Sequence, residues 1–413
     1  MSSPPAHAPL ALERELWTPE VRANPYPLYA RLRKTSPVST LTRPYFGTAW
    51  VLSRYEDVSN ALKDPRLVND RRTLGGSDPF MDRWWMPKTL KAFQNTLIAT
   101  DDPQHRRLRN LVHQAFTPRR VEDLRGKVER LTADLLTRAE KKPAVDLRSD
   151  FALPLPLTII SELLGLPEQD RPRFQRAIAQ VFDSGEPTVL NVLGKIPRAL
   201  GTLRFFRQLI QQRRDRAGED LLSALVAAEE QGDRLSGDEL IAMLFLLLLA
   251  GYETTVNLIG NGTLALLEHP EQLRLLRDRP ELIDSAVEEL LRFTNPVEQP
   301  APRYAREDIE LHGHVIPRGA MVVLLLASAN RDEEAFPNAD ALDLTRGPNR
   351  HVGLGYGVHY CLGAPLARLE ARTALLALIQ RYPKLRLAVP AEQLRWRNSA
   401  SVRGLAKLPV QLI

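Results

Sequence analysis

Residues 351–370 read HVGLGYGVHYCLGAPLARLE and hold the single cysteine of the chain, Cys361. The glycines that precede it permit positive φ angles and a close approach of the backbone to a bulky partner. Leu362 begins a segment with apolar residues at helical spacing, and Pro365 fits the first turn of such a helix. Cys361 is therefore predicted at a helix N-terminus, where unpaired N–H groups and the helix dipole favour a thiolate.

Two interpretations of this cysteine follow from the residues alone. A lone cysteine forms no internal disulfide, so it is either a small buried hydrophobic residue in a tight turn or a thiolate with a chemical role. The glycine-rich approach, the helix start and a histidine two residues upstream, His359, favour the thiolate.

The stretch resembles the haem-binding loop of the cytochrome P-450 family, whose pattern is Phe-x-x-Gly-x-x-x-Cys-x-Gly. The resemblance implies that Cys361 is the proximal thiolate ligand of haem b (iron protoporphyrin IX) and that His359 hydrogen-bonds a haem propionate. Leu354 stands where the family usually has phenylalanine, so the redox tuning of the haem is expected to differ. The residues that carry the resemblance are Leu354, Gly355, Gly357, His359, Cys361 and Gly363.

Further cations match the family's haem contacts. His105 and Arg109 are four residues apart, so they share one face of a predicted helix. Alone, such a pair is more often a solvated face, but it matches the family's His-x-x-x-Arg, and by the same resemblance Arg303 is another propionate contact. A buried dianionic porphyrin edge requires paired positive charge. We therefore expect His105, Arg109, Arg303 and His359 to bind the propionates.

Residues 235–269 give the strongest helix prediction. Ser236 and Glu239 form a capping-box pattern, and the middle of the segment is apolar on every face. An acid and a threonine within such a helix are costly without partners, although Thr254 could simply bond the carbonyl four residues earlier. The segment matches the family's Ala/Gly-Gly-x-Asp/Glu-Thr-Thr/Ser. That resemblance implies that Gly251 leaves room for dioxygen, Thr254 holds a hydrogen-bonded water and Glu253 relays protons.

A helix over residues 281–293 carries Glu289 and Arg292, which match the family's Glu-x-x-Arg lock. Alone, a pair at this spacing is commonly a surface ion pair. The resemblance implies a buried lock that the family often completes with another arginine. Ala341 stands in the expected place of that arginine, and His351 is the predicted substitute.

The predicted substrate pocket draws on loops that have no clear periodicity. Residues 68–101 include two tryptophans that could equally be anchors of a surface loop, and residues 182–201 read as a lid between two helices. Glu298 is expected to point to solvent or, less simply, to meet a basic or hydroxyl-rich substrate. The candidate pocket residues are Trp84, Trp85, Leu97, Ile98, Ala250, Val297, Glu298, Gln299, Ser401 and Val402.

The composition is that of a soluble globular protein, with 44% hydrophobic and 26% charged residues in 413. The N-terminus has no signal-peptide pattern, and the longest apolar run, 240–252, is too short to span a bilayer. We expect a cytoplasmic monomer that binds neither membrane nor nucleic acid. The resemblance implies a mostly α fold with a minor β region, a single triangular haem domain over residues 24–413 after a flexible segment, 1–23.

The implied function is a haem-thiolate monooxygenase that activates dioxygen and hydroxylates or epoxidises a hydrophobic small molecule of lipid, terpenoid, steroid or polyketide type. The sequence has no flavin-, dinucleotide- or cluster-binding motif, so electrons are expected from a separate ferredoxin or flavodoxin and its reductase. The net charge of +6 suits an acidic carrier. The alternatives are a peroxygenase driven by hydrogen peroxide, a non-catalytic haem sensor and a haem-free cysteine hydrolase.

Overall fold

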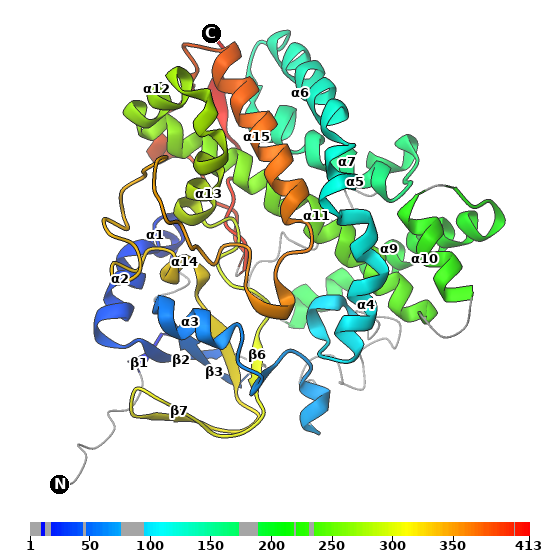
Figure 1. Cartoon of the computed structure of the whole chain (residues 1–413), viewed down its shortest axis with the longest axis vertical. Helices are drawn as coiled ribbons and strands as arrows, with labels where there is room; N and C mark the ends of the chain where they lie inside the picture. The colour runs from blue at the N-terminus through cyan, green and yellow to red at the C-terminus, as the bar shows by residue number, and fades with distance from the viewer. Residues whose placement is uncertain are drawn as a thin grey trace.

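The computed structural model describes residues 10–12, 18–43, 47–75, 95–172, 189–218, 220–230, 235–399 and 401–413. Helices make up most of the molecule, and the strands of its largest sheet gather at one end of it (Figure 1). This arrangement is the predicted mostly α fold with a minor β region. Trp84 and Trp85 lie outside the described residues.

A six-stranded sheet has the order β1-β2-β3-β9-β6-β4. β2 and β3 pair antiparallel as a hairpin, with helices α2 (Tyr26–Thr35) and α3 (Tyr55–Ala61) on either side in sequence. β3 then pairs parallel with β9, which lies about 270 residues further along the chain. The strands are β1 (Leu10–Ala11), β2 (Val38–Arg43), β3 (Gly47–Leu52), β4 (Leu67–Val68), β6 (Arg303–Ala305) and β9 (Met321–Leu324).

Helix α11 (Gly237–Glu268) runs through the centre of the molecule (Figure 1). The predicted capping box is present, since the Ser236 side chain accepts from the Glu239 N–H and the Glu239 side chain accepts from the Ser236 N–H. α11 packs on α7 (Pro154–Leu163), α13 (Ile283–Thr294) and α15 (Ala364–Arg381). Its length and composition would allow a membrane span, but 76% of its most apolar window is buried inside the protein. Packing in the core therefore accounts for its apolar surface.

Two smaller sheets and further helices complete the described part of the chain. Smaller sheets pair β10 (Arg386–Leu387), β11 (Pro409–Gln411) and β5 (Val145–Asp146), and β7 (Ile309–Leu311) with β8 (His314–Ile316). Short turns of 3-10 helix and one π-helical turn, η5 (Arg148–Ala152), connect several elements. The other α-helices are α1 (Pro19–Ala23), α4 (Gln104–His113), α5 (Pro118–Glu122), α6 (Arg125–Glu140), α9 (Val189–Asp215), α10 (Leu221–Glu230), α12 (Pro270–Asp278) and α14 (Leu326–Ala329).

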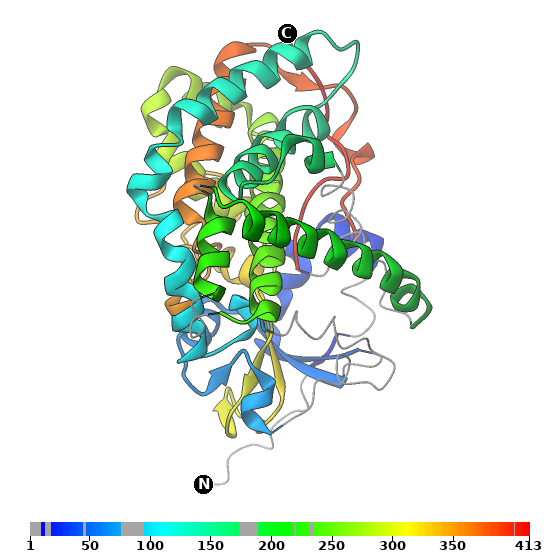
Figure 2. The same ribbon diagram turned by 90° about the vertical axis from the view of Figure 1, so that its right-hand side faces the viewer.

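The expectation of a loop over residues 182–201 is wrong in its second half, because residues 189–201 belong to the long helix α9 (Figure 2), and the lid role stays a prediction. Residues 182–188 lie outside the described residues. Gly194 and Pro197 weaken a helix locally, and this is why the sequence suggested a loop. The C-terminal half of α9 offsets that cost by burying Leu203, Phe206 and Leu209 in the main core.

Candidate functional site

The cysteine loop leads from a tight turn into helix α15. Gly355 has φ 72° and Gly357 has φ 68°, a left-handed conformation that side chains other than glycine rarely adopt. The Cys361 N–H donates to the Leu354 carbonyl at 2.9 Å, which closes the loop on itself. Helix α15 begins at Ala364, directly after Gly363, and Pro365 lies in its first turn. The predicted position of Cys361 just before a helix start is confirmed.

The surroundings of the Cys361 sulfur have opposing effects on the pKa of its thiol. Burial raises the pKa of the thiol, whereas hydrogen bonds from the backbone N–H groups of Gly363 and Ala364 and the charges of Arg109 and Arg368 lower it. Donors and cations that face the sulfur stabilise a thiolate over a thiol. Burial outweighs these contacts, so the pKa of Cys361 is raised overall, and positive charge supplied at the sulfur by a metal ion would favour the thiolate.

A cluster of nitrogen donors lies beside this loop. The rings of His105 and His359 are 4.3 Å apart between centroids, and the Arg109 Nη2 donates to the Tyr360 carbonyl at 2.9 Å. Burial, together with the positive charges of Arg303, His105 and Arg109, lowers the pKa of His359 to about 3. The pKa of His105 is also lowered, by burial and by Arg109. Only part of the positive charge is offset, by Asp102, whose Oδ1 lies 3.5 Å from the His105 Nδ1.

Within the described residues, three buried nitrogen atoms of this cluster have no hydrogen-bond partner. They are the His105 Nε2, the Arg303 Nε and the His359 Nε2. Burying unpaired polar groups is costly, so their convergence indicates a ligand that supplies acceptors. Two carboxylates, such as the propionates of a haem, fit this donor set. The structure thus brings together all four predicted propionate contacts and the predicted iron ligand.

The open face of α11 is formed by Ala250 and Thr254. Ala250 is exposed and Thr254 partly exposed, in the middle of a helix that is otherwise mostly buried. The Thr254 hydroxyl donates to the Ala250 carbonyl at 3.0 Å, which is the local bond that the sequence left open as an alternative. A Cβ at Gly251 would lie 2.8 Å from Ile160 of α7. Gly251 therefore makes room for α7, and its role beside dioxygen stays a prediction.

Two arginines that the sequence did not suggest hold Glu253. Its carboxylate is buried and accepts hydrogen bonds from Arg148 at 3.2 Å and from Arg397. Arg148 begins η5, and Arg397 belongs to the C-terminal segment. The ion pairs explain how an acid is tolerated in an apolar helix. No local pattern could have revealed them, because the partners are 105 and 144 residues away.

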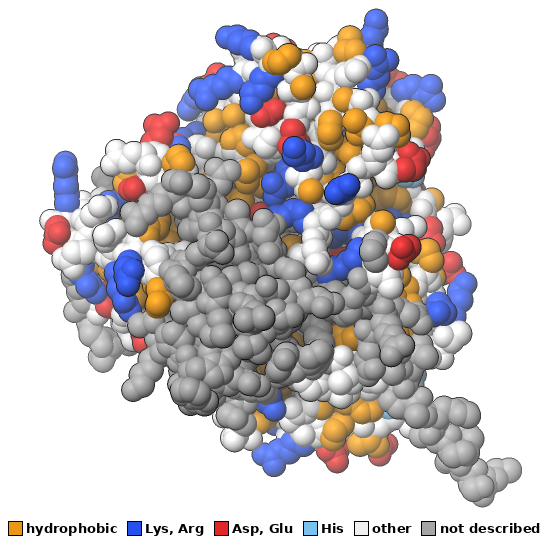
Figure 3. All heavy atoms as spheres, turned by 180° about the vertical axis from the view of Figure 1, so that it is seen from behind, with side chains coloured by type: hydrophobic (Ala, Val, Ile, Leu, Met, Phe, Trp, Pro, Cys, Tyr) orange, Lys and Arg blue, Asp and Glu red, His pale blue; other side chains and the backbone are white. Residues whose placement is uncertain are grey.

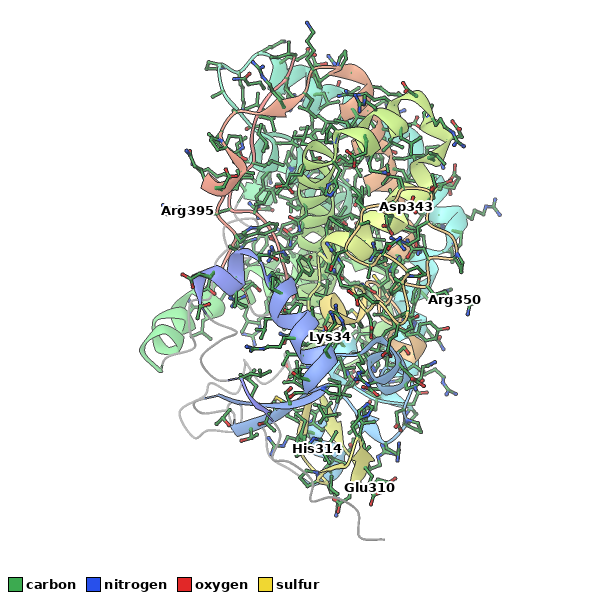
Figure 4. The ribbon with its side chains drawn as sticks, turned by 90° about the vertical axis from the view of Figure 1, so that its left-hand side faces the viewer. Lys34, Glu310, His314, Asp343, Arg350 and Arg395 are labelled. Carbon is green, nitrogen blue, oxygen red and sulfur yellow. The ribbon has the colours of Figure 1, made fainter. Side chains whose placement is uncertain are left out.

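The predicted lock is present but its third member was not foreseen. Glu289 and Arg292 are fully buried and form two hydrogen bonds of 2.8 Å. The Arg346 Nε lies 3.1 Å from both carboxylate oxygens of Glu289, and this arginine takes the place that His351 was expected to fill. Ala341 contributes its carbonyl, which accepts from the Arg292 Nη2 at 3.0 Å. Arg346 lies on the segment that leads from Asp343 to Arg350 along one side of the molecule (Figure 4).

Glu298 is buried, so the expectation that it points to solvent is wrong. Its carboxylate lies 3.8 Å from the Arg403 guanidinium, and burial raises its pKa while Arg403 and Arg22 oppose that rise. Both arginines come from remote parts of the chain, which is why the sequence gave no sign of them. The backbone N–H groups of Glu298 and Gln299 donate to the Ser401 carbonyl.

The other pocket candidates divide into two groups. Val297 pairs with Val402 in an isolated bridge, so the segments predicted to line the pocket do meet. Leu97 and Ile98 share the short helix η3 (Leu97–Ala99), where Leu97 is buried and Ile98 is 46% exposed. Their contact with a substrate stays a prediction.

Comparisons with known proteins agree with this geometry. The family model described as Cytochrome P450 matches residues 33–387. PksS of Bacillus subtilis, described as a polyketide biosynthesis cytochrome P450, is 43% identical over 400 residues, which cover 95% of this chain and 97% of PksS. PikC of Streptomyces venezuelae, a cytochrome P450 monooxygenase, is 41% identical, with 94% of this chain and 91% of PikC covered.

Solved structures give the same result. The myxobacterial cytochrome P450 CYP267B1, determined in complex with myristic acid, superposes with a TM-score of 0.90 at 41% identity, covering 97% of this chain and 99% of that one. The structure of Bacillus subtilis PksS has a TM-score of 0.86 at 42% identity and covers 95% of this chain and 98% of its own. Fold, site and relatives agree, and the chain belongs to the cytochrome P450 family.

Proposed function

We propose that this cytochrome P450 monooxygenase hydroxylates or epoxidises a hydrophobic small molecule of polyketide type in the cytoplasm. Several relatives bear names of this kind, among them 6-deoxyerythronolide B hydroxylase, at 40% identity, and mycinamicin IV hydroxylase/epoxidase, at 42% identity. The observation that carries the monooxygenase chemistry is the cluster of unpartnered donors beside Cys361. One further relative is named vitamin D(3) 25-hydroxylase, at 43% identity, so steroid-like and lipid substrates belong to the same test.

In this proposal Cys361 ligates the haem iron, and His105, Arg109, Arg303 and His359 bind the propionates. Leu354, Gly355 and Gly363 shape the loop against the haem edge. Haem b with a thiolate ligand supplies the activation of dioxygen when it is bound. The protein's contribution is to hold that group in a site where buried cations face its carboxylates.

In the same proposal, residues of α11 deliver the protons that the reaction needs. The Thr254 hydroxyl, anchored to the Ala250 carbonyl, is placed on the exposed face of the helix and would orient a water there. Two arginines bond the Oε1 of Glu253, so a proton relay through this oxygen would first have to replace one of them with water. We propose that Arg148 and Arg397 thereby limit water access to the site.

Electrons are proposed to come from a separate ferredoxin or flavodoxin and its reductase. Three side chains near the cysteine are exposed in the described structure, namely Tyr356 at 49%, Val358 at 58% and Tyr360 at 37%. Arg106 on the nearby helix α4 has a side chain that is 74% exposed. An apolar centre with cations around it suits an acidic carrier. Arg106 pairs with Asp102 at 2.7 Å, and three further arginines that we propose as carrier contacts also pair with acids of this chain, namely Arg107, Arg368 and Arg372.

The experiment is a titration of the purified holoenzyme with a panel of macrolide, steroid, terpenoid and fatty-acid compounds. Displacement of an iron-bound water by a substrate changes the spin state, which absorbance reports. A response confined to polyketide-type compounds would support the proposal, and a response only to fatty acids or steroids would contradict it. Turnover with NADH and a surrogate ferredoxin, compared with turnover on hydrogen peroxide alone, separates a monooxygenase from a peroxygenase. Size-exclusion chromatography with light scattering tests the proposed monomer.

A further inference from the structure

Helix α13 presents two adjacent carboxylates that bind different parts of the molecule. Glu289 belongs to the buried lock with Arg292 and Arg346. Glu288 points instead toward the cysteine loop and helix α15. Its Oε1 lies 2.6 Å from the Arg368 Nε, and its Oε2 lies 2.8 Å from the Arg368 Nη2 and 3.1 Å from the His351 Nε2. Glu288 belongs neither to this lock nor to the proposed haem contacts.

His351 is fixed by bonds on both ring nitrogens. Its Nδ1 accepts from the Gly353 N–H at 3.1 Å, so the ring proton lies on Nε2, which faces Glu288. The histidine side chain is only 4% exposed. A Cβ at Gly353 would lie 3.1 Å from the Leu291 carbonyl of α13, so the loop is pressed against this helix. Glu288 therefore holds the start of the cysteine loop in place.

Arg368 connects the same carboxylate to the end of the loop. Its Nη1 bonds the Tyr360 hydroxyl at 3.1 Å, and Tyr360 directly precedes Cys361. This contact places Arg368 beside the cysteine loop, where its positive charge favours a negative sulfur. Burial would raise the pKa of Glu288, but Arg368 and His351 lower it to about 2, so the carboxylate is charged throughout the working range of the protein. The Glu288 charge thus partly cancels that of Arg368.

We propose that Glu288 is a positioning residue that fixes both ends of the cysteine loop and, by offsetting the Arg368 charge, sets the reduction potential of the iron bound to Cys361. The proposal rests on Cys361 being the iron ligand, as proposed above. One-electron reduction adds a negative charge to the thiolate-ligated haem, and a nearby uncompensated cation stabilises the reduced state. A nearby uncompensated carboxylate has the opposite effect.

The test measures the ferric/ferrous midpoint potential of the holoenzyme by spectroelectrochemistry in four variants. Glu288→Gln leaves Arg368 uncompensated and should shift the potential upward, whereas Arg368→Gln should shift it downward. The double variant should return it to the wild-type value. Asp284→Asn is the matched control, because Asp284 also lies on α13 and pairs with an arginine of α15, Arg372, but is 70% exposed. It should leave the potential unchanged.

The signs of the shifts decide the outcome. Opposite shifts that cancel in the double variant support the proposal, and shifts no larger than that of Asp284→Asn overturn it. Shifts in one common direction also overturn it, because loosening of the loop alone would affect both variants alike. Arg368→Lys keeps the charge and should keep the wild-type potential, which preserves the test if Glu288→Gln does not fold. The ferrous–CO spectrum of the wild type is recorded first, since its failure to show a thiolate-ligated Soret band would refute Cys361 ligation separately.

Discussion

At the scale of single residues, the donor cluster beside Cys361 makes a direct prediction about haem retention. His359→Ala removes one of the unpartnered buried donors, and the propionate that it is proposed to bind would lose a charge-assisted hydrogen bond. We expect haem to transfer to an excess of apomyoglobin roughly tenfold faster, as the loss of about 1.4 kcal/mol implies. His314→Ala is the control, since His314 lies on strand β8 at the sheet end of the molecule (Figure 4). Equal transfer rates would exclude His359 from the haem site.

Thr254 gives a second prediction at this scale. Thr254→Ala removes the hydroxyl on the exposed face of α11, so proton delivery should fail while electron uptake continues. The expected result is continued NADH consumption with several-fold less product and a matching rise in hydrogen peroxide. Thr255→Ala is the neighbouring control, because Thr255 is buried on another side of the helix. If both variants remain equally coupled, Thr254 has only the local helix bond as its role.

Single contacts could be predicted from the sequence only where the residues that make them lie close together in the chain. The cysteine turn could be predicted because its glycines, its cysteine and the proline of the following helix lie within 15 residues. The partners of Glu253 and Glu298 could not, since Arg397 and Arg403 approach them only after the C-terminal segment folds back on α11 and the sheet. A buried acid in an apolar helix signals that partners exist but not which residues they are.

At the scale of elements, we predict that the buried lock contributes much more to the free energy of unfolding than an exposed ion pair does. Arg346→Ala leaves the fully buried Glu289 with one arginine instead of two, and we expect it to lower the free energy of unfolding by about 3 kcal/mol. Lys34→Ala breaks the 3.9 Å pair with Glu333, in which both side chains are more than half exposed, and should change stability by less than about 0.5 kcal/mol. Figure 4 shows Lys34 on the N-terminal helix α2. Urea unfolding followed by circular dichroism measures both.

The low pKa of Glu288, about 2, predicts how stability depends on pH. A carboxylate whose pKa is depressed in the folded state stabilises the protein above its unfolded pKa of about 4.3, and this contribution is lost as the pH falls toward 2. Glu288→Gln should therefore cost up to about 3 kcal/mol at pH 6, and its difference from the wild type should narrow as the pH falls below about 4.5. A difference that stays constant from pH 6 to pH 3 would show that the carboxylate contributes through packing alone.

Helices and sheets differed in how far the sequence could specify them. α11 could be predicted almost to its ends because the capping box and the apolar run are local signals. The loop expected over the second half of residues 182–201 is a helix, because tertiary packing of α9 outweighs the helix-breaking tendency of Gly194 and Pro197. Pairing of β3 with β9 needs contacts across the whole chain, and no local pattern identifies such a partner.

At the scale of the whole molecule, the surface charge bears on electron transfer. On the face shown in Figure 3, lysines and arginines are interspersed with acids, so the net charge of +6 is not concentrated there. The exposed Arg106 lies instead on α4, whose Arg109 contacts the cysteine loop. An acidic carrier would therefore be attracted mainly to the cysteine side of the protein.

This arrangement predicts that reduction by a ferredoxin is steered by charge. Arg106→Glu should slow the second-order reduction rate several-fold at low salt, and the difference from the wild type should shrink as ionic strength shortens the screening length to about 8 Å at 0.15 M. Arg395→Glu is the matched control, because Arg395 is an exposed arginine on the C-terminal segment (Figure 4). Stopped-flow absorbance of the ferrous–CO complex reports the rate. Equal slowing in both variants would indicate a general effect of net charge, and a rate independent of salt would exclude electrostatic steering at the cysteine side.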